Sequence, residues 1–440
     1  MKVDFSLLSI YENFEPARVQ DSQVSEPNIL IWLRNRLCAM WRLGFFFHEM
    51  AFGLLSVFIP LYVVSIAGLN ASLVQLGIMT SAALFAGIPA SYFWGYICDK
   101  TRRFKAYILL SFLSLAAILF SFAFVRSITL FAVLYVAMQM LHVAHESPKN
   151  VLVAEHYSRE EWEKSYAHYE GLTEIGWFVG LLLGMLSAIY SLGSSNVLLL
   201  CAGLNLAAFF LSILLVADPL LIFERRLVGI EKKIDFTYRG IGAASQILDG
   251  YYPSERLKQE SFLAFGVALV FFTLASSIFF TPLPVFFSKQ LGFQTTMVFV
   301  IYMLNSAGSM VGYLVAGRRV AGSNSRTQMI RIVFFRSALV FLLVAVVSSV
   351  FFAPYVTLLS EIILVLLGFA YAVYFILTLS LSMELIPPGK NATFDVLVGI
   401  GAAAGSFLGP FLADAWGFLP EILVAGVLFF IAYLILKIFT

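Results

Sequence analysis

The sequence is poor in charged residues. Only 12% of its 440 residues are Asp, Glu, Lys or Arg, whereas 60% are hydrophobic. Soluble domains carry about 25% charged residues, and a water-soluble fold of this length could not bury so much apolar surface. The chain is therefore predicted to be a polytopic membrane protein. Its net charge of +2 says little, because the positions of the charges matter more than their sum.

Cysteines and catalytic motifs are scarce as well. The three cysteines, Cys38, Cys98 and Cys201, lie in or beside apolar runs without CxxC spacing, which predicts packing residues rather than disulfides or metal ligands. The sequence contains no HExxH, GxSxG, Walker loop or Cys/His ligand spacing, so zinc or serine catalysis and ATP-driven pumping have no motif to support them. We expect a protein that is not an enzyme, with no cofactor, no metal and no nucleic-acid partner.

Long charge-free runs predict the membrane spans, because a helix needs about 20 apolar residues to cross the bilayer. The runs 50–98 and 175–217 each have room for two helices, with breaks at 67–72 and 191–196. The remaining spans are predicted at 106–125, 127 to beyond His142, 261–288, 290–317, 337–383 as two helices broken at Ala353-Pro354, 396–413 and 422–436. The predicted fold is all-α with twelve transmembrane helices.

The basic residues predict the topology. If both termini and the polar segment 218–260 are cytoplasmic, 26 of the 28 Lys and Arg residues fall on or near the cytoplasmic side, as the positive-inside rule requires. The predicted parts are a cytoplasmic tail at 1–36, a six-helix bundle at 37–217, a cytoplasmic linker at 218–260 and a second bundle at 261–440. No cleavable signal peptide is apparent, and Ile29–Leu33 is either a short surface helix or part of a loose leader.

The turn between the second and third predicted helices carries the most specific motif. Gly95, Asp99, Lys100 and Arg103 fit a Gly-x-x-x-Asp-basic pattern followed by a basic group. The pattern resembles the loop signature of the major facilitator superfamily, in which Gly usually stands at the position of Arg102. Gly312-Tyr-Leu-Val-Ala-Gly317-Arg318-Arg319, which ends the eighth predicted helix, echoes this motif in the second half of the chain.

The resemblance covers the helices from about Trp41 to Lys437 and implies several expectations. It implies two pseudo-symmetric six-helix bundles, a solute site between them near mid-membrane, and alternating access. It also implies that Asp99 docks near the start of the eleventh helix, with Arg103 and Glu155 joining a cytoplasmic gate latch. Asp395 lies in the first turn of that helix and would repel Asp99. The alternative is that these charges only enforce topology.

Ionisable residues inside spans are functional candidates by default. Tyr135, Gln139, His142, Glu146 and Lys149 recur at steps of three and four and so share one face of the fourth helix. His48 and Glu49 lie within the first helix and point about 100° apart. Glu170 and Glu174 open the fifth helix, and neighbouring carboxylates favour protonation of one another. We hypothesise that Glu49, Glu146 and Glu174, with His48 and His142, include a proton-coupling site. The alternative is a structural polar cluster that joins the first, fourth and fifth helices.

The second half offers fewer candidates. These are Asn305 deep in the eighth helix, and Glu361, Tyr371 and Tyr374 in the tenth. Glycines at four-residue spacing predict close helix packing, in the fifth helix (Gly176, Gly180, Gly184) and in the eleventh (Gly401, Gly405, Gly409).

The sequence thus predicts a multi-pass transporter of the cell membrane that works as a monomer. It would move a small-molecule solute through the lipid bilayer, with the proton as coupling ion. The alternatives are an uncoupled facilitator and, from a different class, a transporter-like receptor or structural membrane protein without flux.

Overall fold

The computed structural model describes residues 40–156, 162–218, 254–319, 325–385 and 392–439. The folded unit begins at Trp41, and in the described residues all regular structure is helical. Twelve helices in this part are long and apolar enough to cross a membrane, which confirms the predicted number. The first six are α2 (Arg42–Val64), α3 (Leu73–Thr101), α4 (Phe104–Phe122), α5 (Ile128–His142) continued by η2 (Val143–His145) and α6 (Glu146–His156), α7 (Trp162–Ile189) and α8 (Ser194–Leu215).

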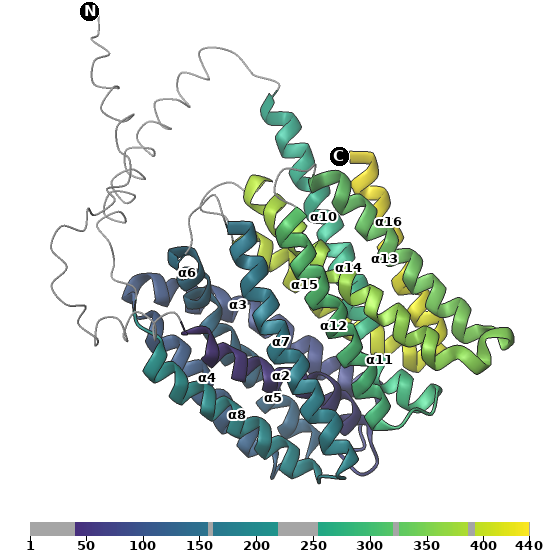
Figure 1. Ribbon diagram of the computed structural model, residues 1–440, viewed down its shortest axis with the longest axis horizontal. Coiled ribbons are helices and arrows are strands. Elements are labelled where there is room, and N and C mark those ends of the chain that lie inside the picture. The colour runs from purple at the N-terminus through teal and green to yellow at the C-terminus, as the bar shows by residue number, and fades with distance from the viewer. Residues whose placement is uncertain (1–39, 157–161, 219–253, 320–324, 386–391, 440) are drawn as a thin grey trace, which may run out of the picture. The chain divides into compact units, whose positions relative to one another are not determined.

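The last six spans follow the segment 219–253, which lies outside the described residues (Figure 1). They are α10 (Ser254–Phe280) with α11 (Leu283–Val285) and η4 (Phe286–Gln290), α12 (Thr295–Arg319), α13 (Ser325–Ser348), α14 (Val356–Leu385) preceded by η5 (Val350–Tyr355), α15 (Ala392–Trp416) and α16 (Phe418–Phe439). α10 begins inside the segment that the sequence assigns to the linker. The predicted tail at 1–36, including 29–33, lies outside the described residues.

The helices break where turn residues interrupt the apolar runs. Ser72 caps α3: its hydroxyl accepts from the backbone N–H of Gln75, whose side chain accepts from the N–H of Ser72. Asn70 and Ser191 adopt left-handed backbone conformations in the turns before α3 and α8. The tenth span starts with a 3₁₀ turn that contains Pro354, at the predicted break.

The ninth helix differs from the prediction. The sequence places its start at Ser337, directly after Arg336, because the charge-free run begins there. In the structure α13 starts at Ser325, so Arg336 lies in the middle of the helix and inside the span Arg326–Ser348. An arginine therefore lies within the span rather than on the expected cytoplasmic border.

The first six and last six helices pack in the same pattern. α2 packs on α7 and α8, α3 on α5, and α4 on α8. The corresponding contacts in the second half join α10 to α15 and α16, α12 to α14, and α13 to α16. This correspondence is the pseudo-symmetry expected of two repeated six-helix halves.

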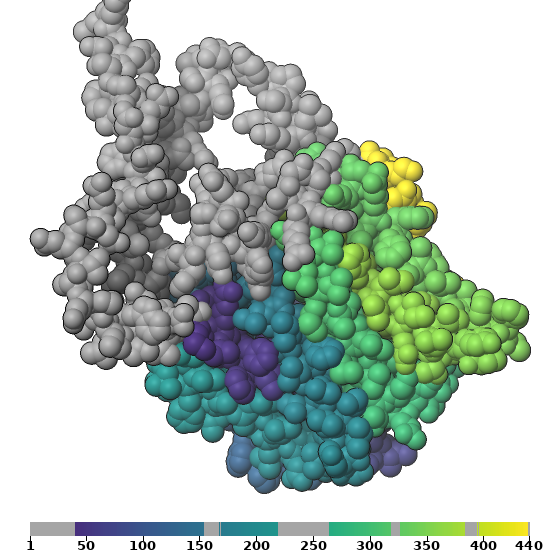
Figure 2. All heavy atoms as spheres, viewed as in Figure 1, coloured from purple at the N-terminus to yellow at the C-terminus, as the bar shows by residue number. Residues whose placement is uncertain are grey.

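The halves meet along two equivalent helix pairs. α7 packs on α12 and α3 packs on α15, and in Figures 1 and 2 the teal of α7 meets the green of α12. A Cβ built on Gly317 of α12 would lie 3.0 Å from the Cβ of Ala167 of α7. On the other pair, the Thr80 hydroxyl lies 3.4 Å from the carbonyl oxygen of Ser406.

The six glycines named by the sequence lie at close helix contacts. A Cβ on Gly176 or Gly180 would collide with backbone carbonyls of α2, and one on Gly184 would collide with the Phe299 ring of α12. Gly401, Gly405 and Gly409 face backbone carbonyls of α10 in the same way. The helix pairs α2–α7 and α10–α15 therefore approach closely at equivalent positions of the two halves.

Candidate functional site

The polar residues of α2 point to two different neighbours. His48 is fully buried, and its Nδ1 lies 2.8 Å from the Asn205 Oδ1 of α8. Glu49, the next residue, faces α7: a Cβ built on Gly176 would lie 3.2 Å from the Cβ of Glu49. The 100° step between adjacent helical residues thus sends one group into the first half and the other toward the acids of α7.

The fourth span changes geometry where its polar stripe becomes charged. α5 ends at His142, the 3₁₀ turn η2 covers Val143–His145, and α6 starts at Glu146. Glu146 and Lys149 form an ion pair one turn apart. Further along the stripe, Gln139 contacts Gly87 of α3, and Tyr135 is half-buried against a hydrophobic cluster of the first half. The structure therefore places the charged end of the stripe near α2 and α7, and the other end in packing contacts.

The acids of α7 lie at the boundary between the halves. The Glu174 Oε1 accepts a 2.6 Å hydrogen bond from the Ser306 hydroxyl of α12. Gly171, on the same stretch of α7, faces the Tyr313 side chain of α12 at 3.9 Å from a built Cβ. Glu174 is thus a half-buried acid of the first half whose hydrogen-bond partner belongs to the second half.

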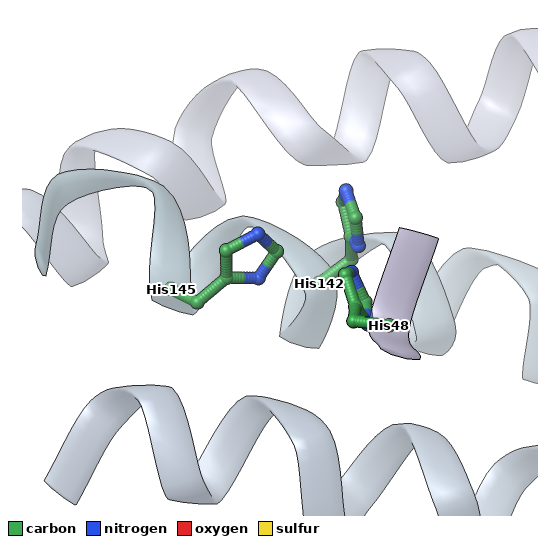
Figure 3. A group of neighbouring side chains, drawn as sticks. All are labelled: His48, His142 and His145. Atoms are coloured by element: carbon green, nitrogen blue, oxygen red, sulfur yellow. The ribbon is translucent and has the colours of Figure 1, made fainter. Parts of the chain in front are cut away.

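Three histidines of the first half come together (Figure 3). The ring centroids of His48 and His142 are 5.1 Å apart, and His145 lies 4.8 Å from each of them. His145 was not singled out from the sequence, since its contact with His48 joins residues that are distant along the chain.

Most second-half candidates make packing contacts. The Asn305 amide donates to the carbonyl oxygen of Leu364 at 2.7 Å, joining α12 to α14. Tyr374 is buried and stacks on Phe272 with a centroid separation of 3.5 Å. Tyr371 is more exposed, and Glu361 is half-buried near the start of α14. Of the two tyrosines, Tyr371 is therefore the one whose side chain is accessible.

Arg336 is a buried cation that sequence analysis missed. Only 1% of it is exposed, and its guanidinium lies 5.1–5.5 Å from four aromatic ring centroids, those of Phe272, Phe280, Tyr371 and Phe429. No described carboxylate pairs with it. Its place in an aromatic run of the sequence is the only signal that could have marked it.

The structure defines the backbone of the turn motif and the positions of its described side chains. Arg102 closes α3 with φ 56° and ψ 28°, the left-handed conformation that favours glycine. Asp99 and Arg103 are exposed, and Lys100 lies 5.9 Å from the Tyr96 ring. A Cβ on Gly95 would meet no described atom within 4 Å. The side chains of Glu155 and Asp395 lie outside the described residues, so the proposed docking of Asp99 stays a prediction.

A cavity of about 890 Å³ opens beside the turn 65–68 that follows α2. Both halves line it: Tyr62 and Ser187 belong to the first, and Lys289 and Gln294 to the second. Polar groups from both halves thus reach one space between them.

Comparisons with known proteins agree with this arrangement. Residues 43–394 match the sequence profile of the Major Facilitator Superfamily. The fold is similar to the crystal structure of the nucleoside transporter NupG, with a TM-score of 0.62 and 13% identity over 92% of this chain and 98% of that one. It is also similar to the human organic anion transporter MFSD10, with a TM-score of 0.61 and 14% identity over 93% of this chain and 100% of that one.

No curated protein sequence matches the chain significantly. The family match covers most of the chain, and the structural similarity shows the same fold. Family and fold indicate membrane solute transport, not enzymatic catalysis. The chain belongs to the Major Facilitator Superfamily.

Proposed function

We propose that this protein moves a small solute by alternating access and couples the movement to protons through Glu174. The observation that carries the proposal is the 2.6 Å hydrogen bond from Ser306 to the Glu174 carboxylate. It joins α7 to α12, and these helices form one of the two most extensive contacts between halves. Protonation of Glu174 would therefore directly change the strength of the α7–α12 contact, along which the halves separate.

The charge state of Glu174 changes the strength of this contact. A hydrogen bond to an ionised carboxylate is roughly twice as strong as a neutral one. The ionised acid would hold α7 against α12, and protonation would weaken that hold. By linkage, a conformation in which the halves separate at this point would then bind the proton more tightly.

Among the described residues, the groups that affect Glu174 are a hydroxyl and other acids rather than a cation. Its titratable neighbours are Glu49 of α2, Glu170 of α7, Tyr313 of α12 and Tyr371 of α14. Lys149 forms its ion pair with Glu146 instead. The only described hydrogen bonds to the Glu174 carboxylate come from the Ser306 hydroxyl, which supports an acid that exchanges its proton during transport.

The structural neighbours suggest the first solute classes to assay. Those neighbours are a nucleoside transporter and an organic anion transporter. We propose that a single chain in the cell membrane is the transporting unit. The test is uptake of labelled nucleosides and organic anions into proteoliposomes, with and without an imposed pH gradient.

In this assay the wild type should accumulate one solute class only when the pH gradient is present. Glu174→Gln should still exchange that solute across the membrane but lose the response to the gradient, and Ser306→Ala should respond partially. Glu361→Gln, a half-buried acid of α14, serves as the matched control and should respond normally.

Three outcomes would count against the proposal. Wild-type uptake that ignores the gradient would favour an uncoupled facilitator, and specific solute binding without flux would favour a receptor. Full coupling in Glu174→Gln would remove Glu174 from the mechanism. Coupling that also survives in Glu49→Gln and Glu146→Gln would end the sequence-based hypothesis as a whole.

A further inference from the structure

The histidine group of the first half has the donors of a metal site. His48 comes from α2, His142 ends α5, and His145 lies in η2. One ring nitrogen from each residue lies within 4.8 Å of the other two. Figure 3 shows the three rings gathered between their helices, with the ring of His145 beside those of His142 and His48.

The hydrogen bonds of His48 leave a nitrogen lone pair available. The Asn205 amide donates through Nδ2 to the carbonyl oxygen of Cys201 at 3.1 Å, which turns its Oδ1 toward His48. Because an amide oxygen only accepts, the Nδ1 of His48 carries the proton and Nε2 does not. That Nε2 is buried without a hydrogen-bond partner, in a side chain that is 0% exposed. A histidine held through its other nitrogen by an oxygen is the usual outer-shell arrangement of a metal ligand.

The other two histidines show a similar pattern. The Nδ1 of His142 is also buried without a partner. The Ser111 hydroxyl lies 3.3 Å from the carbonyl oxygen of His142 and 3.1 Å from the Nδ1 of His145. When Ser111 donates to that carbonyl, it accepts from the Nδ1–H of His145, and the Nε2 of His145 is then the nitrogen that can bind an ion. The Nε2 of His145 lies 3.4 Å from the Oε1 of Glu146, whose other oxygen pairs with Lys149.

The surroundings favour a cation as well. Three carboxylates, those of Glu49, Glu146 and Glu170, lie around Lys149 and place negative charge beside the group. Phe52 and Phe112 pack on the His48 ring and keep it in an apolar shell. Buried polar atoms without a partner destabilise a fold, and a bound metal ion would satisfy the Nε2 of His48 and the Nδ1 of His142 at once.

We propose that His48, His142 and His145 bind a divalent transition-metal ion of the zinc class. Imidazole nitrogens suit Zn²⁺, Cu²⁺ and Ni²⁺. Three histidines with one open position form a known zinc arrangement, in which Zn–N distances of about 2.0–2.1 Å bring the nitrogens to roughly 3.3 Å from one another. The nitrogens therefore need to approach one another by up to about 1.5 Å. The ion would fasten the start of α2 to α5 and η2, all in the first half, and this binding is independent of proton coupling.

The test uses the full chain in detergent, purified with a tag that contains no histidine and stripped of metal by a chelator. Titration with Co²⁺ should give the visible absorption of a tetrahedral site at one ion per chain, and Zn²⁺ should displace it. His142→Ala and His145→Ala should each weaken Zn²⁺ binding by more than about tenfold. Asn205→Ala, which removes only an outer-shell partner, should weaken it by about 10–100-fold.

His142 is only half-buried, so its variant is the one expected to fold most readily, and its elution profile in size exclusion would verify this. The matched control is the double variant His156→Ala/His168→Ala, which keeps all three proposed ligands and should bind Zn²⁺ like the wild type. The proposal is overturned if the wild type binds no stoichiometric ion. Binding that is indifferent to His142→Ala, or lost in the control variant, would overturn it equally.

Discussion

Arg102 adopts a backbone conformation that suits glycine better than arginine. It closes α3 in the left-handed conformation where the family motif usually has glycine. For a residue with a Cβ this conformation costs roughly 1–2 kcal/mol. Glycine removes this cost but loses more backbone entropy on folding, about 0.5–1 kcal/mol. Arg102→Gly should therefore raise the free energy of unfolding by a net of about 0.5–1 kcal/mol, measured as a higher melting temperature in detergent.

The neighbouring arginine provides the control for this prediction. Arg103 is also exposed but has φ −101°, so it has no left-handed backbone strain that glycine could remove. Arg103→Gly should leave the melting temperature unchanged or lower it. If Arg102→Gly lowers it as well, the Arg102 side chain contributes more than its backbone conformation costs.

Arg336 leads to a second prediction for a single residue. Its guanidinium lies among four aromatic rings inside a membrane span. A desolvated cation–π contact contributes about 2 kcal/mol or more, and a planar guanidinium stacks on rings where an ammonium does not. Arg336→Lys should therefore lower the melting temperature more than Arg336→Met, which removes the buried charge at similar length. A lysine variant as stable as the wild type would contradict this role for the rings.

At the level of helices, the contact between α2 and α7 depends on Gly180. A Cβ there would collide with the carbonyl oxygen of Met50, and a helix backbone cannot shift far without disturbing its neighbours. Overpacking of this kind costs about 1–3 kcal/mol, so Gly180→Ala should lower the melting temperature. Gly203 of α8 is the matched control, since it is exposed and a Cβ would meet no described atom within 4 Å. Gly203→Ala should be neutral or stabilising, because alanine favours helix by about 1 kcal/mol.

The helices themselves could be predicted because a membrane span requires a sequence pattern that is easy to recognise. A span needs a long charge-free run, and the turns at 67–72, 191–196 and 353–354 interrupt such runs. The same criterion misplaced the start of α13. It treats every arginine as a border, whereas Arg336 is accommodated in the span by aromatic side chains of α10, α14 and α16.

The candidate site could be predicted only in part, for a similar reason. Glu174 and His48 stand out as ionisable residues inside spans. Their partners do not: Ser306 and Asn205 are ordinary polar residues that become significant only through contacts between distant helices. His145 is likewise recognised as a candidate only because the 3₁₀ turn places it beside His48. Helical spacing identifies residues on one helix, and packing decides which helices share a site.

For the whole molecule, the pairing of α7 with α12 and of α3 with α15 sets how the halves could move. Within each half, glycines bring backbones together on α2–α7 and α10–α15. The contacts between halves are as extensive, but there the glycines face side chains, such as Gly184 with the Phe299 ring, and polar groups meet, such as Glu174 with Ser306. This difference favours two tightly packed halves that rock as units against each other.

A disulfide across the α7–α12 contact tests this rocking. A Cβ on Gly317 would lie 3.0 Å from the Cβ of Ala167, close to the roughly 3.5–4.5 Å found in disulfides. In a background without Cys38, Cys98 and Cys201, Ala167→Cys/Gly317→Cys should lose solute flux in proteoliposomes on oxidation and regain it with a reductant. Each single-cysteine variant should transport equally under both conditions. Undiminished flux in the fully cross-linked protein would mean that the halves do not separate at this end of α7, and transport would then require bending within a half.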